Sequence, residues 1–267
     1  MTEPLPGEAA SASGGAQQPR RWLAPTLIVI GFIPALIIGW ALIDNSGPVQ
    51  PIGFPELNVG GEVVEYGAID DRTLHLHVLG GAAGEARPTA VFVHGAREHP
   101  GTYETQARAV VDAGGVAVLV EYSSFAEDAD TARQHEDVAA ALTLLDAEAA
   151  RFGVDVDRLT VVAAASGSRA STYGWTEGLG TPLPSAFVFL SATHEASSWP
   201  ELASGPRVTM LHGTSDALIP LRRARNLCDA MPDCTLEVFE GGDHRFYASG
   251  ALRLDATEII VDTVVGR

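Results

Sequence analysis

The fold is decided by the stretch Arg158–Ser171, which reads RLTVVAAASGSRAS. Its apolar part, 159–165, is a continuous run too short for a helix, which is typical of a strand buried on both faces. The small residues Ser166-Gly167-Ser168 follow at once and open a segment of helical character. The stretch therefore predicts a strand, a sharp turn and a helix, with a serine at the bend.

Segments of strand and helix character alternate on both sides of this stretch, which favours a mainly parallel sheet. The expected strands are 62–66, 73–79, 89–94, 116–122, 159–165, 186–191, 208–212 and 235–240. The expected helices are 102–113, 131–152, 169–177, 221–230 and 251–265. We therefore expect one α/β domain over residues 62–267, with an eight-stranded sheet flanked by helices.

Three further loops place polar residues directly after expected strands. Asp216 lies in MLHGTSDALIP (210–220), His244 lies in GGDHRF (241–246), and the segment His94-Gly95-Ala96 follows the third strand. The carboxyl ends of parallel strands share one edge of a sheet, so these residues are expected near Ser166. For Asp216, capping of the helix 221–230 is the alternative role.

These motifs, with Ser, Asp and His in that order, resemble those of the α/β-hydrolase family. The resemblance covers about residues 62–265 and implies a lidless, dienelactone-hydrolase-like or esterase-like domain that cleaves small carboxylic esters without a cofactor. It implies Ser166 as the nucleophile, His244 as the general base and Asp216 as the carboxylate that orients the base. The backbone N–H groups of Ala96 and Gly167 would bind the oxyanion.

The nucleophile motif departs from the family pattern G-x-S-x-G. Without a gap, Ala163 and Gly167 take the two glycine positions and Ala165 takes the serine position. One extra strand residue would bring Ser166 into place, and Ser168 is a third possibility. The alternative function is a catalytically inactive domain of the same fold, which binds a ligand or partner at the cell envelope.

Composition narrows the classes of function. The 267-residue chain has a net charge of −17 and a pI near 4.7, so a polyanion such as nucleic acid is repelled. All 17 basic residues are arginine. Without lysine, Schiff-base chemistry, a Ser-Lys dyad and a phosphate-binding P-loop lysine are excluded.

The N-terminal region predicts a single membrane anchor. Residues 1–21 have the composition of a disordered tail, and 22–43 carry no charge. As a helix, this span would be about 33 Å long, enough for a hydrocarbon core of about 30 Å. The preceding arginines place the tail in the cytoplasm and the domain outside, joined by a linker over 44–61. A cleavable signal peptide is the alternative.

The two cysteines, Cys228 and Cys234, lie close in sequence after an expected helix. In a domain outside the cytoplasm, this spacing favours a disulfide over two buried thiols.

Other side chains offer weaker signals. His75 and His77 share one strand face, but no third ligand is in view, so we expect no metal site. Trp199 and Phe246 are candidates for the walls of the substrate pocket, and core packing is the alternative for both.

Overall fold

The structure is a computed structural model that describes residues 57, 59–69, 72–96, 98–124, 131–176, 181–193 and 205–267. The strands are β1 (Glu62–Ile69), β2 (Arg72–Leu79), β3 (Arg87–Val93), β4 (Val116–Val120), β5 (Val154–Ala164), β6 (Ala186–Leu190), β7 (Arg207–Gly213) and β8 (Cys234–Phe239). The helices are η1 (Pro100–Tyr103), α2 (Glu104–Asp112), α3 (Thr131–Ala147), α4 (Ala149–Phe152), α5 (Ser166–Thr176), α6 (Leu221–Asp229) and α7 (Leu252–Val265).

The strands form one eight-stranded sheet in the order β1-β2-β4-β3-β5-β6-β7-β8. β2 pairs antiparallel with both β1 and β4, and every later pairing is parallel. The predicted α/β fold with a mainly parallel sheet of eight strands is confirmed.

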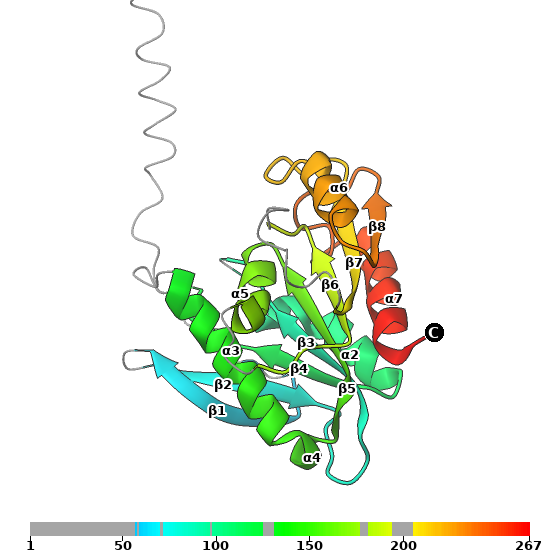
Figure 1. Cartoon of the computed structure of the whole chain (residues 1–267). Helices are drawn as coiled ribbons and strands as arrows, with labels where there is room; N and C mark the ends of the chain where they lie inside the picture. Colours follow the sequence, from blue (N-terminus) through cyan, green and yellow to red (C-terminus); the bar gives the residue numbers. More distant parts are fainter. Residues whose placement is uncertain are drawn as a thin grey trace, which may run out of the picture. The chain divides into compact units, whose positions relative to one another are not determined.

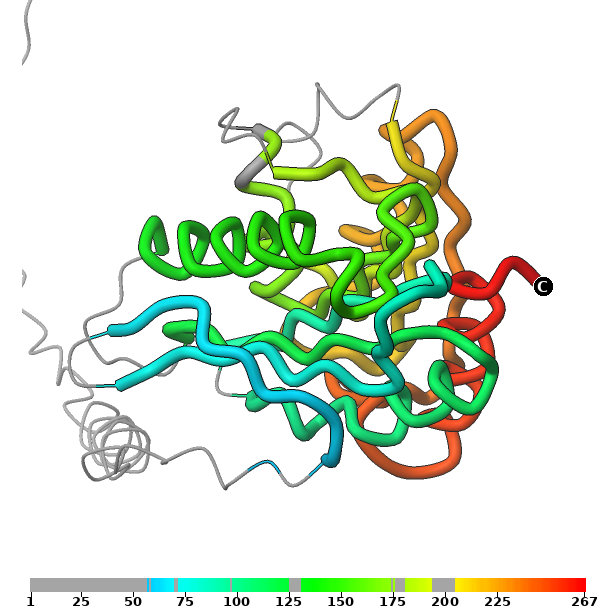
Figure 2. The backbone as a smooth tube through the Cα atoms, turned by 90° about the horizontal axis from the view of Figure 1, so that it is seen from below, coloured from blue at the N-terminus to red at the C-terminus, as the bar shows by residue number. Residues whose placement is uncertain are grey.

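Helices cover both faces of the sheet (Figure 1). Seen from below, α3 lies on one side of the strands and α2 with α7 on the other (Figure 2). Alternate residues of a central strand pack on opposite faces of the sheet. In β6, Phe187 and Phe189 belong to the hydrophobic cluster between the sheet and α3, α5 and α6. Val188 and Leu190 belong to the cluster between the sheet and α2 and α7. Strands buried on both faces explain the continuous apolar runs in the sequence.

The predicted helix 131–152 is interrupted, because Glu148 leaves helical geometry with φ −103° and ψ 12° between α3 and α4. Gly153 ends α4 in the left-handed region, at φ +65°. A Cβ on Gly153 would lie 2.3 Å from the carbonyl oxygen of Ala82, so only glycine fits there. The chain then turns into β5, which begins at Val154 rather than at the expected 159.

The predicted disulfide between Cys228 and Cys234 is confirmed, with a Cα–Cα distance of 5.3 Å. It joins the end of α6 to the start of β8. The predicted tail (1–21) and anchor (22–43) lie outside the described residues, as does most of the linker (44–61). Within the described part of the chain, no helix has both the length and the apolar character to cross a membrane.

Candidate active site

The predicted site loops all begin where a parallel strand ends, at one edge of the sheet. The oxyanion loop (His94–Ala96) follows β3, and Ala165 follows β5. Asp216 follows β7 and His244 follows β8. Two hydrogen bonds join these loops in pairs: Ala96 with Ser166, and Asp216 with His244. Among the described residues, no hydrogen bond joins Ser166 to His244.

The sharp turn after β5 is centred on Ala165, which has φ +44°. Few non-glycine residues adopt this left-handed conformation, and the α/β-hydrolase nucleophile stands on such a strained strand-to-helix turn. Ser166 is already the first residue of α5. The expectation that an extra strand residue brings Ser166 to the bend is therefore wrong. From Thr160 to Ala164, β5 pairs with β6 in unbroken register, so this part of the strand holds no extra residue. The irregularity in the pairing of β5 with β3 lies before Leu159.

The hydroxyl of Ser166 lies at the oxyanion loop. Its Oγ accepts a hydrogen bond from the backbone N–H of Ala96 at 2.8 Å. The residue is partly exposed. The structure thus brings together Ser166 and the predicted oxyanion donor Ala96, with Ser166 one position beyond the strained residue.

Gly167 lies where α5 approaches β3. A Cβ at this position would lie 2.3 Å from the carbonyl oxygen of His94 and 2.6 Å from that of Val93. This close approach explains why the position holds a glycine, and it matches the second glycine of the ungapped pattern. The residue that directly follows the strained turn is Ser166 rather than Gly167.

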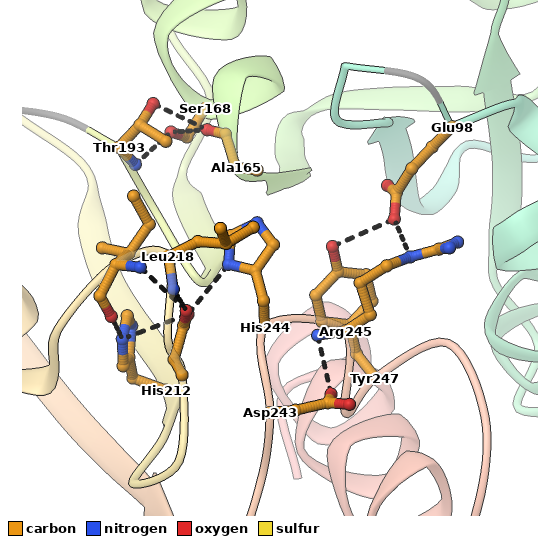
Figure 3. A network of polar contacts seen from close by, with 12 residues as sticks. Glu98, Ala165, Ser168, Thr193, His212, Leu218, Asp243, His244, Arg245 and Tyr247 are labelled. Carbon is orange, nitrogen blue, oxygen red and sulfur yellow. Dashed lines mark hydrogen bonds and ion pairs between the residues drawn. The ribbon is translucent and has the colours of Figure 1, made fainter. Parts of the chain in front are cut away.

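Ser168 is fully buried and its hydroxyl is engaged. Its Oγ donates to the carbonyl oxygen of Ala165 at 2.6 Å. Thr193 donates to the same carbonyl from its Oγ1 at 3.1 Å, and its N–H reaches Ser168 Oγ at 3.4 Å (Figure 3). Ser168 therefore supports the strained turn and is not placed to attack a substrate.

Asp216 is held in one orientation by donors on both carboxylate oxygens. Its Oδ1 accepts the N–H groups of Leu218 at 2.9 Å and Ile219 at 2.8 Å. Its Oδ2 lies 2.8 Å from His244 Nδ1 and 3.5 Å from His212 Nε2. Burial by itself would raise the pKa of Asp216, but the Ile219 N–H, the His244 ring and the Leu218 N–H outweigh it and lower that pKa.

His244 is oriented by this carboxylate. Its Nδ1 is the atom that meets Asp216, which leaves Nε2 for other partners. Its side chain is 19% exposed, whereas that of Asp216 is 0% exposed. In Figure 3 the ring of His244 lies between the turn at Ala165 and the loop of Leu218. The side chain of His244 is therefore accessible to solvent, whereas the carboxylate of Asp216 is not.

Two other histidines at this edge are structural. His94 is fully buried against Tyr122, with ring centroids 4.4 Å apart, and burial lowers its pKa to about 4. His212 is also fully buried, and its Nε2 lies 2.7 Å from the carbonyl oxygen of Ile219. Both rings fix the loops that carry the site.

The histidine pair on β2 meets a carboxylate on the neighbouring strand end. His75 Nδ1 lies 2.9 Å from Glu121 Oε2, and His77 Nε2 lies 2.8 Å from Glu121 Oε1. Within the described ranges, no group of three or more histidine, cysteine or acidic residues is arranged to hold a metal ion.

The two pocket candidates have different outcomes. Phe246 is a core residue: it is 4% exposed and stacks on Phe239 with ring centroids 4.5 Å apart. The structure thus agrees with core packing, the alternative given for Phe246. Trp199 lies outside the described residues.

Sequence reasoning missed the buried carboxylate of Glu98, which contacts both the oxyanion loop and the loop of His244. It accepts from Gly95 N–H at 3.0 Å and from Arg245 Nε at 2.8 Å. The available signal was its position three residues after Gly95, in a loop already singled out. Nothing in the sequence pairs it with Arg245, 147 positions away.

No protein-family model and no curated protein sequence matches the chain. Solved structures with the same fold do. Esterase 2 of Thermogutta terrifontis phosphorylated by paraoxon matches with a TM-score of 0.67 and 20% sequence identity, over 77% of this chain and 93% of the esterase. The native form of this thermophilic planctomycete enzyme matches with a TM-score of 0.66 and 20% identity, over 78% and 92% of the two chains.

The same esterase phosphonylated by cyclosarin gives a TM-score of 0.66 at 21% identity, over 77% of this chain and 93% of the other. At this identity the likeness establishes the fold alone. The described domain thus has the α/β-hydrolase type of fold seen in these esterases.

Proposed function

We propose that the domain hydrolyses carboxylic esters through an acyl-enzyme, with Ser166 as the nucleophile. Ser166 Oγ would attack the ester carbonyl carbon while His244 Nε2 takes the hydroxyl proton. His244 would return that proton to the alcohol oxygen as the C–O bond breaks. Water, deprotonated by His244, would then attack the acyl carbonyl carbon, and His244 would return this proton to Ser166 Oγ as the bond between that oxygen and the acyl group breaks and the carboxylic acid leaves. No cofactor takes part.

The observation that carries this proposal is the 2.8 Å contact between His244 Nδ1 and Asp216 Oδ2. A buried carboxylate at Nδ1 selects the tautomer whose Nε2 can accept a proton, and it stabilises the imidazolium that results. The two residues are 28 positions apart, on loops after different strands. A general base held in this way is what ester hydrolysis requires.

The oxyanion loop supports the same proposal. The N–H of Ala96 donates to Ser166 Oγ in the free protein, at 2.8 Å. In the proposed complex, a substrate carbonyl oxygen takes over this donor, and the N–H of Gly167 is the second one. The proposed nucleophile and the proposed oxyanion donor are therefore already adjacent before a substrate binds.

A second candidate function is ligand binding without catalysis. It is favoured by Ala165, because the strained position that carries the nucleophile in α/β hydrolases holds a methyl group here. In that case Asp216 and His244 would hold a ligand by hydrogen bonds, and no covalent intermediate would form.

A fluorophosphonate probe, which labels only an activated serine, distinguishes the two candidates. The full chain, Ser166→Ala and Ser168→Ala would be treated in parallel, and esters of increasing acyl length would be tested as substrates. We expect labelling of the native chain and of Ser168→Ala, and none of Ser166→Ala. A native chain that is neither labelled nor active on the esters supports the binding protein instead.

The membrane anchor is part of the proposal. It rests on the 22 uncharged residues of 22–43 and on the arginines before them. The catalytic domain would lie outside the cytoplasm and act on small esters there. Protease added to intact cells is expected to digest the domain, and protection until lysis would reverse the orientation.

A further inference from the structure

The carboxylate of Glu98, next to the candidate site, accepts four hydrogen bonds. Its Oε2 accepts the N–H of Gly95 at 3.0 Å and the hydroxyl of Tyr103 at 3.1 Å. Its Oε1 accepts Nε of Arg245 at 2.8 Å and the hydroxyl of Tyr247 at 3.2 Å. Glu98 is 4% exposed, so this is a buried charge satisfied on both oxygens.

The donors come from the two loops that carry the proposed chemistry. Gly95 directly precedes Ala96, whose N–H is the proposed oxyanion donor. Arg245 directly follows His244, the proposed base. Figure 3 shows Glu98 above Arg245 and Tyr247, with His244 beside them. One side chain therefore ties the oxyanion loop to the histidine loop.

The side chains packed around Glu98 and Gly95 restrict the movement of both residues. The rings of Tyr103 and Tyr247 stack with centroids 6.0 Å apart, and both residues are fully buried. A Cβ on Gly95 would lie 3.2 Å from that of Ala165 and 3.3 Å from Glu98 Oε2. The oxyanion loop is thus confined between the strained turn and the carboxylate, and a shift of Glu98 moves the loop.

We infer that Glu98 is a positioning residue, which fixes the spacing between the Ala96 N–H and the His244 ring. This inference rests on the proposed function, because the spacing matters to a reaction in which the two groups act on one carbonyl. A small misplacement of such groups lowers the rate of the chemical step more than it weakens substrate binding.

The test compares Glu98→Gln with Glu104→Gln in the full chain. Glu98→Gln keeps the shape and removes the charge. Glu104→Gln removes an acid nearby that forms an exposed pair with Arg108 at 2.8 Å, so it is the matched control. We expect Glu98→Gln to lower kcat by about 10- to 100-fold with little change in KM, and Glu104→Gln to leave both unchanged. An unchanged kcat in folded Glu98→Gln overturns the inference, as does a loss confined to KM.

A proton NMR measurement separates this inference from the proposed function. The Nδ1 proton of His244, held by Asp216, should shift or exchange faster in Glu98→Gln and stay unchanged in Glu104→Gln. If the native chain cleaves no ester, the proposed function fails, and this resonance still decides whether Glu98 positions His244. If Glu98→Gln does not fold, Tyr247→Phe removes one donor and should move the same resonance by less. A resonance identical in all variants overturns the inference.

Discussion

In the loops after β7 and β8, the side chains have the arrangement that the proposed chemistry requires. In the turn after β5, the backbone has the conformation of a nucleophile turn, but the residue at the bend has no hydroxyl group. The first region, which we call the acid–base half, consists of Asp216 and His244, joined at 2.8 Å with Asp216 Oδ1 bound by two N–H groups. The second region, the nucleophile half, is the turn Ala165–Ser168. Its strained residue is an alanine, and the nearest accessible hydroxyl is one position further on.

This difference shows that, in the nucleophile half, the backbone conformation is stabilised by interactions that do not involve a reactive side chain. The turn keeps φ +44° at Ala165 because Ser168 and Thr193 both donate to its carbonyl oxygen and β5 stays in register with β6. None of these contacts needs a hydroxyl at position 165. In the acid–base half, geometry and chemistry are not separate, because the hydrogen bond that orients His244 on Asp216 is also the one proposed to act in the reaction.

The largest expected effect concerns the nucleophile half. Ser166→Ala should lower kcat/KM by about 10⁴- to 10⁶-fold if Ser166 attacks the substrate, while the fold remains intact. Ester hydrolysis and circular dichroism measure the two outcomes. Ala165→Ser is the counterpart, because it puts a hydroxyl at the strained position. If Ala165→Ser becomes labelled by a fluorophosphonate and the native chain does not, the nucleophile half lacks its nucleophile.

The next effect concerns the acid–base half. Asp216→Asn should lower kcat by about 10⁴-fold, because an amide at this position no longer selects the His244 tautomer or stabilises its cation. Steady-state kinetics at constant pH checks this value, with Glu104→Gln as the control. A loss below tenfold would mean that the pair with His244 is structural only.

The same carboxylate predicts a dependence of stability on pH. The pKa of Asp216 is lower in the folded protein than in the unfolded chain, so its ionised form stabilises the fold. This contribution is complete above the unfolded pKa of about 3.9 and is lost as pH falls through the folded pKa. The difference in unfolding free energy between the native chain and Asp216→Asn should therefore be constant above about pH 5 and shrink below about pH 4. Denaturant titrations at several pH values test it, and a difference that grows on acidification contradicts it.

Removal of the disulfide between Cys228 and Cys234, which lies near the acid–base half in the sequence, is expected to have a smaller effect. Cys228 and Cys234 close a loop with a sequence separation of 6, between the helix after the acid loop and the strand before the histidine loop. Replacing both by alanine should cost about 2 kcal/mol of unfolding free energy in the chain-entropy model. Activity of the folded variant should remain, since Asp216 precedes the start of α6 and His244 follows the end of β8, whereas the two cysteines lie at the opposite ends of these elements. Loss of activity without loss of stability would show that the bond positions the site.

The smallest effect tests the strain itself. Glycine adopts φ +44° more readily than alanine does, so Ala165→Gly should change the unfolding free energy by less than about 1 kcal/mol. Ala164→Gly, one residue earlier in β5, is the control and should destabilise by about 1 kcal/mol or more, since its side chain is fully buried. Thermal denaturation measures both. Equal losses would mean that Ala165 carries no strain.

The sequence predicts most of the fold and half of the site. Apolar runs locate the central strands β3, β4 and β6 to within a few residues, because strands buried on both faces have few polar positions to obscure the pattern. Asp216 and His244 are found because each follows an expected strand within a recognisable loop. Their mutual contact is not readable from the sequence, since it depends on β7 lying beside β8.

Two features escape sequence reasoning for different physical reasons. The position of the strained turn depends on a one-residue register, and the run Ala163–Ser166 consists of small residues that suit either register. The structure decides it through the pairing of Ala164 with Leu190. Glu98 escapes because its partner Arg245 is at the far end of the chain, and a lone acid in a loop has many possible roles.

The alanine at the bend also has a genetic consequence. Alanine and serine codons of the GCN and TCN sets differ in the first base alone. A single nucleotide substitution would therefore put a hydroxyl at position 165, on a backbone already held in the required conformation by Ser168 and Thr193.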